Sequence, residues 1–191
     1  MCSSDLGASA AALNLSFTDA AGKPLIDAVA LLEAASGNAP VKPLADVEIS
    51  QAKRQFSPRV TLITTGTRAT FPNFDTVRHH VYSFSPTKTF ELKLYAGVPG
   101  VPLLFDKPGV AVLGCNIHDT MAAWVVVADT PWFARSGANG RARIDAVPAG
   151  NYRLRLWHPG LAPGTEPAPI TLSVGAGDVE HSTRLAVRAE P

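Results

Sequence analysis

Charge of one sign, cysteine and long apolar runs are all scarce in this sequence. Its 17 Lys and Arg residues almost balance its 16 Asp and Glu residues, giving a net charge of +1. Because no block of like charges occurs, nothing indicates a nucleic-acid partner or an anionic membrane. No stretch is long and apolar enough to predict a transmembrane segment. Only two cysteines occur, and no Cys-x-x-Cys or His-x-His pair is present to complete a structural zinc site.

Turn residues, in contrast, are abundant. The 191 residues include 16 prolines and 15 glycines, which separate short segments rich in Val, Leu, Thr and Phe. Sustained helical periodicity is rare. This composition predicts an all-β protein, and the length is sufficient for one large or two small domains.

The first six residues, MCSSDL, do not resemble a natural start. They match the translation of a common sequencing-adapter end, so we expect residues 1–6 to be a non-native start of a truncated gene. A lipoprotein-like cysteine is the alternative, but the basic and apolar segment that should precede it is missing. We therefore expect a secreted or periplasmic protein whose signal peptide was lost by truncation.

Residues 13–34 predict a strand, a turn and a second strand. Leu13, Leu15 and Phe17 alternate with polar residues, as in a half-buried strand. The alanines of 28–35 are compatible with a helix, but the preceding Gly-Lys-Pro turn favours a strand. A Gly, Pro and Asn-rich linker follows at 36–43.

The remaining segments also have β character. Short apolar segments with turns every eight to twelve positions run from Val47 to about residue 130, which is typical of a β-sandwich or barrel. Beyond them, Asn139-Gly140 predicts a hairpin, and Pro-Ala-Gly at 148–150 predicts a turn. The alternation of Tyr152, Leu154 and Leu156 predicts a further strand.

The segment GCNIHDTM, residues 114–121, places Cys115, His118 and Met121 within seven residues. A thiolate, an imidazole and a thioether form a soft, mixed ligand set that suits copper better than zinc. A copper electron-transfer site of this kind needs a second histidine from elsewhere in the chain.

The segment NFDTVRHHVYSF, residues 73–84, offers that histidine. In an extended strand Val77, His79 and Val81 share one face, and His80 lies on the other. Because the face with two valines is the buried one, His79 is the better ligand. His80 is expected at the surface or just behind the ligands.

The region resembles a cupredoxin of the plastocyanin and amicyanin type, and we expect residues 44–131 to form this domain. QFSPRVTLITTGTRATFPNFDTVRHHV is similar to the opening of these proteins, and CNIHDTM carries their Cys-x-x-His-x-x-Met loop in its shortest, amicyanin-like spacing. The resemblance implies a Greek-key β-sandwich that binds one type 1 copper ion. The ligands that it implies are His79, Cys115, His118 and Met121.

Two positions depart from the family pattern. The family usually has Asn after the first ligand histidine, where it ties the two ligand loops together, and this sequence has His80. Pro often follows the second histidine, and this sequence has Asp119. Both positions surround the ligands and influence the reduction potential more than the choice of metal.

The flanks resemble the two ends of a carboxypeptidase-regulatory-like β-sandwich. DAAGKPLIDAVALL carries its early Gly-x-Pro-Leu pattern, and SGANGRARIDAVPAGNYRLRLWHPG carries its late Pro-Ala-Gly turn and Tyr-x-Leu strand. We therefore expect residues 7–36 and 132–188 to form a smaller, discontinuous sandwich. The whole chain resembles bacterial proteins of the methylamine utilisation, plastocyanin-like type.

The resemblance implies a periplasmic blue-copper electron carrier that is not an enzyme. Electrons are then expected to enter and leave through His118. Ile117 and Met121 form a docking patch, with Asn116 and Asp119 beside it. The expected partner is a c-type cytochrome or a dehydrogenase that binds transiently, and the carrier itself is expected to be a monomer.

Two other functions are compatible with the sequence. A copper-binding or delivery protein would use the same ligands without a redox partner, and a metal-free β-sandwich binding module would tolerate loss of Cys115. A multicopper enzyme is disfavoured because His-x-His pairs are absent, and a binuclear copper centre because the ligand loop has one cysteine. His158 and His181 have no partners at ligand spacing, so we expect both to be structural.

Overall fold

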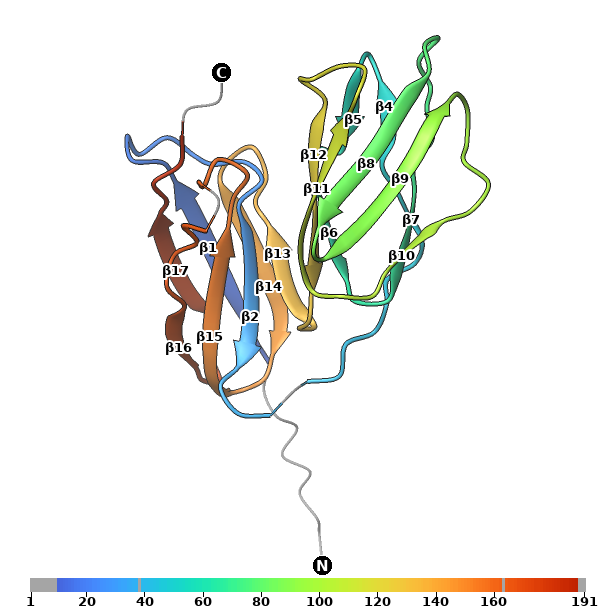
Figure 1. The fold of residues 1–191 in the computed structure, drawn as a ribbon. Helices are drawn as coiled ribbons and strands as arrows, with labels where there is room; N and C mark the ends of the chain where they lie inside the picture. The colour runs from blue at the N-terminus through green and yellow to red at the C-terminus, as the bar shows by residue number, and fades with distance from the viewer. Residues whose placement is uncertain (1–9, 38, 163, 189–191) are drawn as a thin grey trace, which may run out of the picture. The chain divides into compact units, whose positions relative to one another are not determined.

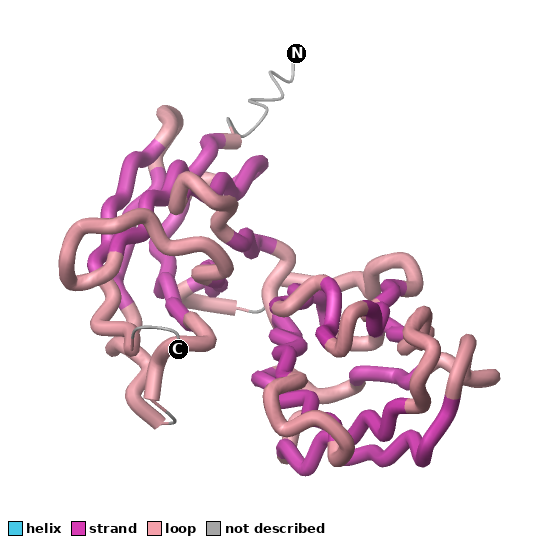
Figure 2. The backbone as a smooth tube through the Cα atoms, turned by 90° about the horizontal axis from the view of Figure 1, so that it is seen from above, coloured by secondary structure: helices cyan, strands magenta, loops and turns pink. Residues whose placement is uncertain are grey.

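The structure is a computed structural model that describes residues 10–37, 39–162 and 164–188. The predicted non-native segment 1–6 lies outside this range. The described residues form strands, turns and loops without a helix (Figure 2), so the predicted all-β fold is confirmed. Among them, no helix is long and apolar enough to cross a membrane.

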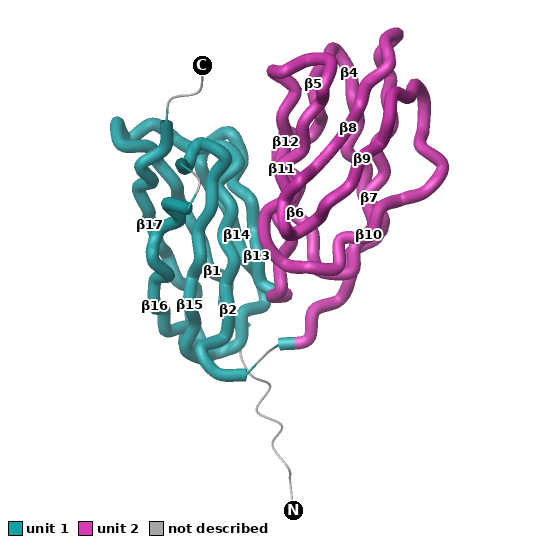
Figure 3. Tube along the Cα trace, viewed as in Figure 1, with its two compact units in different colours: residues 1–39, 132–191 teal, residues 40–131 magenta. Residues whose placement is uncertain are grey.

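The chain divides into two compact units (Figure 3). Residues 1–39 and 132–191 belong to unit 1, and the continuous segment 40–131 forms unit 2. Unit 1 is therefore built from both ends of the chain, with the whole of unit 2 placed between them in sequence.

Unit 1 is a sandwich of a three-stranded and a four-stranded sheet. The smaller sheet has the order β14-β1-β17, and the larger has the order β13-β2-β15-β16 (Figure 1). The strands are β1 (Ala11–Thr18), β2 (Val29–Ala34), β13 (Trp132–Arg135), β14 (Arg141–Val147), β15 (Gly150–Trp157), β16 (Ile170–Val174) and β17 (Val179–Arg184). The strand predicted over the alanine-rich stretch is β2, as expected from the turn before it.

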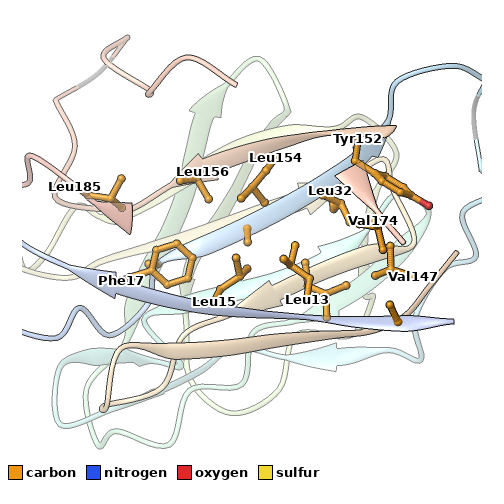
Figure 4. Close-up of a cluster of buried hydrophobic side chains, with 14 residues drawn as sticks. Leu13, Leu15, Phe17, Leu32, Val147, Tyr152, Leu154, Leu156, Val174 and Leu185 are labelled. Carbon is orange, nitrogen blue, oxygen red and sulfur yellow. The ribbon is translucent and has the colours of Figure 1, made fainter. Parts of the chain in front are cut away.

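The core of unit 1 comes from alternating apolar side chains on both sheets. Leu13, Leu15 and Phe17 of β1 face Leu154 and Leu156 of β15 across the interior (Figure 4). Because successive side chains of a strand point to opposite faces, the apolar alternation of each segment determines which face is buried. The predicted alternation in β15 is confirmed.

The predicted hairpin at Asn139-Gly140 is a turn between two sheets instead. Gly140 N–H donates to the carbonyl of Gly137 at 2.9 Å, which closes the turn. However, β13 pairs with β2 and β14 pairs with β1, so the strands on either side of the turn belong to different sheets. A local turn signal fixes the reversal of the chain but not the partner of each strand.

Unit 2 contains a five-stranded sheet in the order β6-β12-β11-β8-β9 and a three-stranded sheet in the order β10-β7-β3. A two-stranded hairpin, β4-β5, completes it. The strands are β3 (Val47–Glu48), β4 (Ser50–Ala52), β5 (Gln55–Ser57), β6 (Val60–Thr64), β7 (Thr67–Thr70), β8 (His79–Ser85), β9 (Lys88–Tyr95), β10 (Leu103–Phe105), β11 (Gly109–Cys115) and β12 (Ala122–Ala128).

The core of unit 2 lies between its sheets. Phe71, Phe105, Leu113 and Val125 are buried in one apolar cluster. Cys115 and Met121 belong to the same cluster, so the end of this core is also the place where the predicted ligands gather.

The strand with the paired histidines begins later than the alternation predicts. We expected Val77, His79 and Val81 on one buried face, but β8 starts at His79, and Val77 is 37% exposed in the loop before it. The expectation for Val77 is therefore wrong. His79 and Val81 are both fully buried, because the alternation holds within the strand itself.

Candidate metal centre

Strand register brings three distant segments together at one end of unit 2. Cys115 lies opposite Val81 in the antiparallel pair β11 and β8. Gly114 lies opposite Ala122 in the pair β11 and β12. The end of β11, the start of β8 and the loop 116–121 therefore meet at the upper end of unit 2 in Figure 1.

His79, Cys115 and His118 form a compact cluster. The nearest ligand atoms of the three side chains all lie within 4.8 Å of one another. Cys115 Sγ is 3.8 Å from His79 Nδ1, and the centroids of the two imidazole rings are 5.1 Å apart at an interplanar angle of 63°. Two imidazoles and one thiol therefore converge on a common point.

Three of the four predicted ligands are buried, and the fourth is partly exposed. His79 is fully buried, Cys115 is 3% exposed and Met121 is 2% exposed, whereas His118 is partly exposed. Cys115 is a free cysteine. It lies in the apolar core cluster of unit 2 together with Met121.

One unmatched atom shows that the cluster fits a metal ion. His118 Nδ1 is buried and has no hydrogen-bond partner among the described residues. A buried imidazole nitrogen without a partner is costly, but it is what a metal ligand requires. The donor set of two imidazoles and a thiolate, with a thioether packed into the same core, suits copper.

A tight turn fixes His118 and Met121 relative to each other. The N–H of Met121 donates to the carbonyl of His118 at 3.0 Å. The three-residue spacing between His118 and Met121 therefore closes one turn, and the loop returns directly into β12 at Ala122.

His80 and Asn116 tie the two ligand loops together. Asn116 Nδ2 lies 3.2 Å from His80 Nδ1, so the amide donates to the ring. On its other side, His80 Nε2 lies 2.9 Å from Glu91 Oε1. The link that the resemblance assigns to an Asn after the first histidine is thus formed here by a histidine, with the amide contributed by the opposite loop.

Asp75, which was not among the predicted site residues, contacts His79. His79 Nε2 lies 2.8 Å from Asp75 Oδ2. Burial raises the pKa of Asp75, but hydrogen bonds from the Arg54 N–H, the His79 ring and the Lys53 N–H outweigh it and hold the pKa below its ordinary value. The carboxylate is ionised at neutral pH and accepts the proton of Nε2. In the neutral ring with its proton on Nε2, the lone pair of Nδ1 faces Cys115.

A second buried polar group lies behind the cluster. Tyr95 Oη donates to the carbonyl of Phe71 at 2.6 Å and accepts from Gln51 Nε2 at 2.5 Å. Burial raises the pKa of Tyr95 to about 12; the Gln51 hydrogen bond opposes the rise, and the charge of Cys115 adds to it. This group was also missed, because nothing in the local sequence relates Gln51 to Tyr95.

An open groove of about 510 Å³ lies beside the cluster. Its lining includes Tyr82, Phe84 and Val112 as well as Cys115 and Met121. Phe84 is 73% exposed, and its ring lies 5.0 Å from that of Tyr82. The outer face of β8 and β11 is therefore apolar and aromatic where it approaches the cysteine.

The predicted docking residues have different exposures. Ile117 is 50% exposed, and Asp119 is also exposed, so both are accessible to a partner. Met121 is buried, and the expectation that it forms part of the contact surface is therefore wrong. The structure places it in the core cluster beneath the loop.

The two remaining histidines lie in unit 1. His158 Nδ1 accepts from the Gly160 N–H at 2.9 Å, and its Nε2 lies 3.0 Å from the Ile26 carbonyl. His158 thus bridges backbone groups. His181 lies on β17, in register with Leu15 of β1.

Comparison with solved structures gives cupredoxins as structure neighbours. A purple cupredoxin from Nitrosopumilus maritimus is 23% identical, with a TM-score of 0.37, and the match covers 44% of this chain and 99% of that one. Amicyanin from Paracoccus versutus is 16% identical, with a TM-score of 0.36, over 50% of this chain and 96% of that one. A Cu-containing nitrite reductase from Thermus scotoductus is 24% identical, with a TM-score of 0.40, over 59% of this chain and 28% of that one. No protein-family model and no curated protein sequence matches the chain.

Proposed function

We propose that this protein is a type 1 copper protein that carries single electrons between redox partners. The observation that carries the proposal is that one ligand atom each of His79, Cys115 and His118 lies within 4.8 Å of the others, while His118 Nδ1 is buried without a hydrogen-bond partner among the described residues. His79, Cys115 and His118 would hold the ion, and the Met121 thioether would supply a weaker fourth ligand. Copper bound there supplies a Cu(II)/Cu(I) couple, which takes up and releases one electron.

The protein's own contribution is to hold the ligands still. Cys115 is fixed by its ladder with β8, and His79 by its contact with Asp75. When little rearranges between two oxidation states, electron transfer meets a low barrier. The buried thiol loses its proton when a metal binds, because a coordinating thiol is held as the thiolate.

Electrons would enter and leave through the His118 loop. His118 is partly exposed, and its neighbour Ile117 projects into solvent. Phe74 and Val77 are also exposed in the loop that precedes His79. Exposed apolar residues in these two loops suit a small, transient interface, and we propose a c-type cytochrome or a dehydrogenase in the periplasm as the partner.

We also propose domain identities for the two units. Unit 2 would be the cupredoxin domain, and unit 1 would be a carboxypeptidase-regulatory-like sandwich assembled from the flanks. We further propose that the chain is of the bacterial methylamine utilisation, plastocyanin-like type and that it acts as a monomeric carrier rather than as an enzyme.

The first experiment is a visible absorption titration of the purified apo-protein with Cu(II). We expect an intense blue or green band that saturates at one copper per chain. Cys115→Ser should abolish the band, because the thiolate is its source, whereas the matched control His181→Asn in unit 1 should leave it intact. A colourless titration of the unchanged protein would overturn the proposal.

The copper-delivery alternative is tested by metal exchange. Burial of Cys115 and His79 supports a site that retains its metal, so a competing chelator should remove copper slowly. Complete exchange on mixing, without a reversible one-electron couple in voltammetry, would favour delivery instead.

A further inference from the structure

The carboxylate of Asp75 joins the buried His79 to the turn of the β4-β5 hairpin. Oδ2 faces His79 Nε2 at 2.8 Å and also accepts from the Arg54 N–H at 2.9 Å. Oδ1 accepts from the Lys53 N–H at 2.6 Å. One side chain thus accepts hydrogen bonds from the ring of a candidate ligand and from two backbone groups in another part of unit 2.

The hairpin turn depends on this carboxylate. Ala52 pairs with Gln55, so Lys53 and Arg54 form a two-residue turn, and their φ angles are 54° and 58°. Such a turn prefers Asn-Gly, because positive φ is unfavourable for residues with longer side chains. The two hydrogen bonds that Asp75 accepts stabilise the turn, although Lys and Arg are unfavourable at positive φ.

Asp75 is itself held from behind. Its N–H donates to Asn73 Oδ1 at 2.9 Å, which forms an Asx-turn. Asn73 Nδ2 in turn donates to the carbonyls of Val77 and Tyr95, each at 2.9 Å. The carboxylate of Asp75 is therefore held in place by hydrogen bonds that involve the β4-β5 turn, the loop before β8 and the end of β9.

We propose that Asp75 is the positioning residue of the metal centre and that, through it, the β4-β5 hairpin is part of the site. This inference rests on the proposed function. Asp75 fixes the proton of His79 on Nε2, directs Nδ1 toward Cys115 and makes the ring a stronger donor. A stronger donor favours the more highly charged Cu(II) over Cu(I), so Asp75 lowers the reduction potential and raises the affinity for Cu(II).

The test compares Asp75→Asn and Asp75→Ala with the unchanged protein. Asp75→Asn keeps an acceptor oxygen but removes the charge, so we expect a higher reduction potential with a small loss of affinity. Asp75→Ala removes both, and Cu(II) affinity should fall by about 10- to 100-fold, the usual cost of losing a partner of a metal-binding histidine. Nitrogen NMR of the apo-protein should show that His79 loses its fixed Nε2–H form in Asp75→Ala.

The double variant Lys53→Asn/Arg54→Gly separates the two contacts of Asp75. It supplies residues that favour the turn on their own, so the hairpin no longer depends on the carboxylate. This variant should keep the colour, affinity and potential of the unchanged protein. Asp75→Ala introduced into this background should still lower the affinity and raise the potential.

Two results would overturn the inference. One is a coloured Asp75→Ala protein with unchanged potential, affinity and NMR signals. The other is an effect of Asp75→Ala that disappears in the Lys53→Asn/Arg54→Gly background, because Asp75 would then act only on the hairpin. A colourless unchanged protein is a different result, which overturns the proposed function itself.

Discussion

The ring of Tyr82 lies directly over the α-carbon of Gly114. A β-carbon added to Gly114 would lie 2.7 Å from both Cζ and Oη of that ring. The two residues are opposite each other in the ladder between β8 and β11, and Gly114 is the immediate neighbour of Cys115. An aromatic side chain therefore covers the backbone next to the candidate thiolate.

The first prediction concerns this contact. Gly114→Ala should lower the free energy of unfolding of unit 2 by about 1 kcal/mol, because the tyrosine ring must move away. In a Tyr82→Ala background the same change should be neutral or slightly stabilising, since glycine within a strand is itself unfavourable. Urea unfolding of the four proteins measures the coupling, and equal costs in both backgrounds would contradict it.

The second prediction concerns the link between the ligand loops. Asn116→Ala removes the amide that donates to His80, and we expect copper affinity to fall by about tenfold, with faster loss to a chelator. His80→Asn, which places the residue usual in cupredoxins at this position, should retain most of the affinity because an amide can again bridge the loops. Competition titrations measure both variants. An equal copper affinity of Asn116→Ala and the unchanged protein would show that the contact between Asn116 and His80 does not hold the ligand loops together.

The third prediction is a loss of stability at high pH. Burial raises the pKa of Tyr95 to about 12 in the folded protein, whereas an exposed tyrosine has a pKa of about 10. The unfolded chain therefore releases this proton first, so the stabilisation is complete below pH 10 and is lost as pH rises toward 12. The full loss is at most about 2 to 3 kcal/mol.

Chemical unfolding of the apo-protein between these pH values measures the effect, and Tyr95→Phe is the control. The phenylalanine variant lacks the titrating group, so its stability should fall less steeply over the same range. The same slope in both proteins would assign the pH dependence to other groups.

The fourth prediction concerns His158 of unit 1. His158→Ala leaves the Gly160 N–H and the Ile26 carbonyl without their partner. It should lower the free energy of unfolding of unit 1 by about 2 to 3 kcal/mol. His181→Ala is the matched control and should cost less, because His181 Nε2 is buried without a hydrogen-bond partner among the described residues. Neither variant should alter the copper spectrum, which provides the second readout beside thermal unfolding.

Much of the fold could be predicted because burial follows local alternation. Leu13, Leu15 and Phe17 carry the period of a half-buried strand, and the structure buries all three. The Asn139-Gly140 turn was also located correctly. Its flanking strands were not, because β13 and β14 pair with strands more than a hundred residues away in sequence, and a turn carries no information about such partners.

The site divides in the same way. Cys115, His118 and Met121 lie close in sequence, so their proximity follows from one short loop, and His79 follows from alternation within its strand. Asp75, Gln51 and Tyr95 could not be assigned, because their roles depend on which loop faces which ring. For Asp75, the only local signal in the sequence is that a carboxylate lies four residues before a candidate ligand histidine, and this spacing was not used.

The division of unit 1 between the two ends of the chain has a consequence for synthesis on the ribosome. β1 pairs with β17, so that Leu13 lies opposite Val179, and neither sheet of unit 1 can close until the last strands emerge. Unit 2, which is continuous over residues 40–131, has all its strands available much earlier. The partners of β1 and β2 all follow residue 131, so both segments stay unpaired while unit 2 folds. Long-range strand pairing of this kind is slow and leaves strand edges exposed in the meantime.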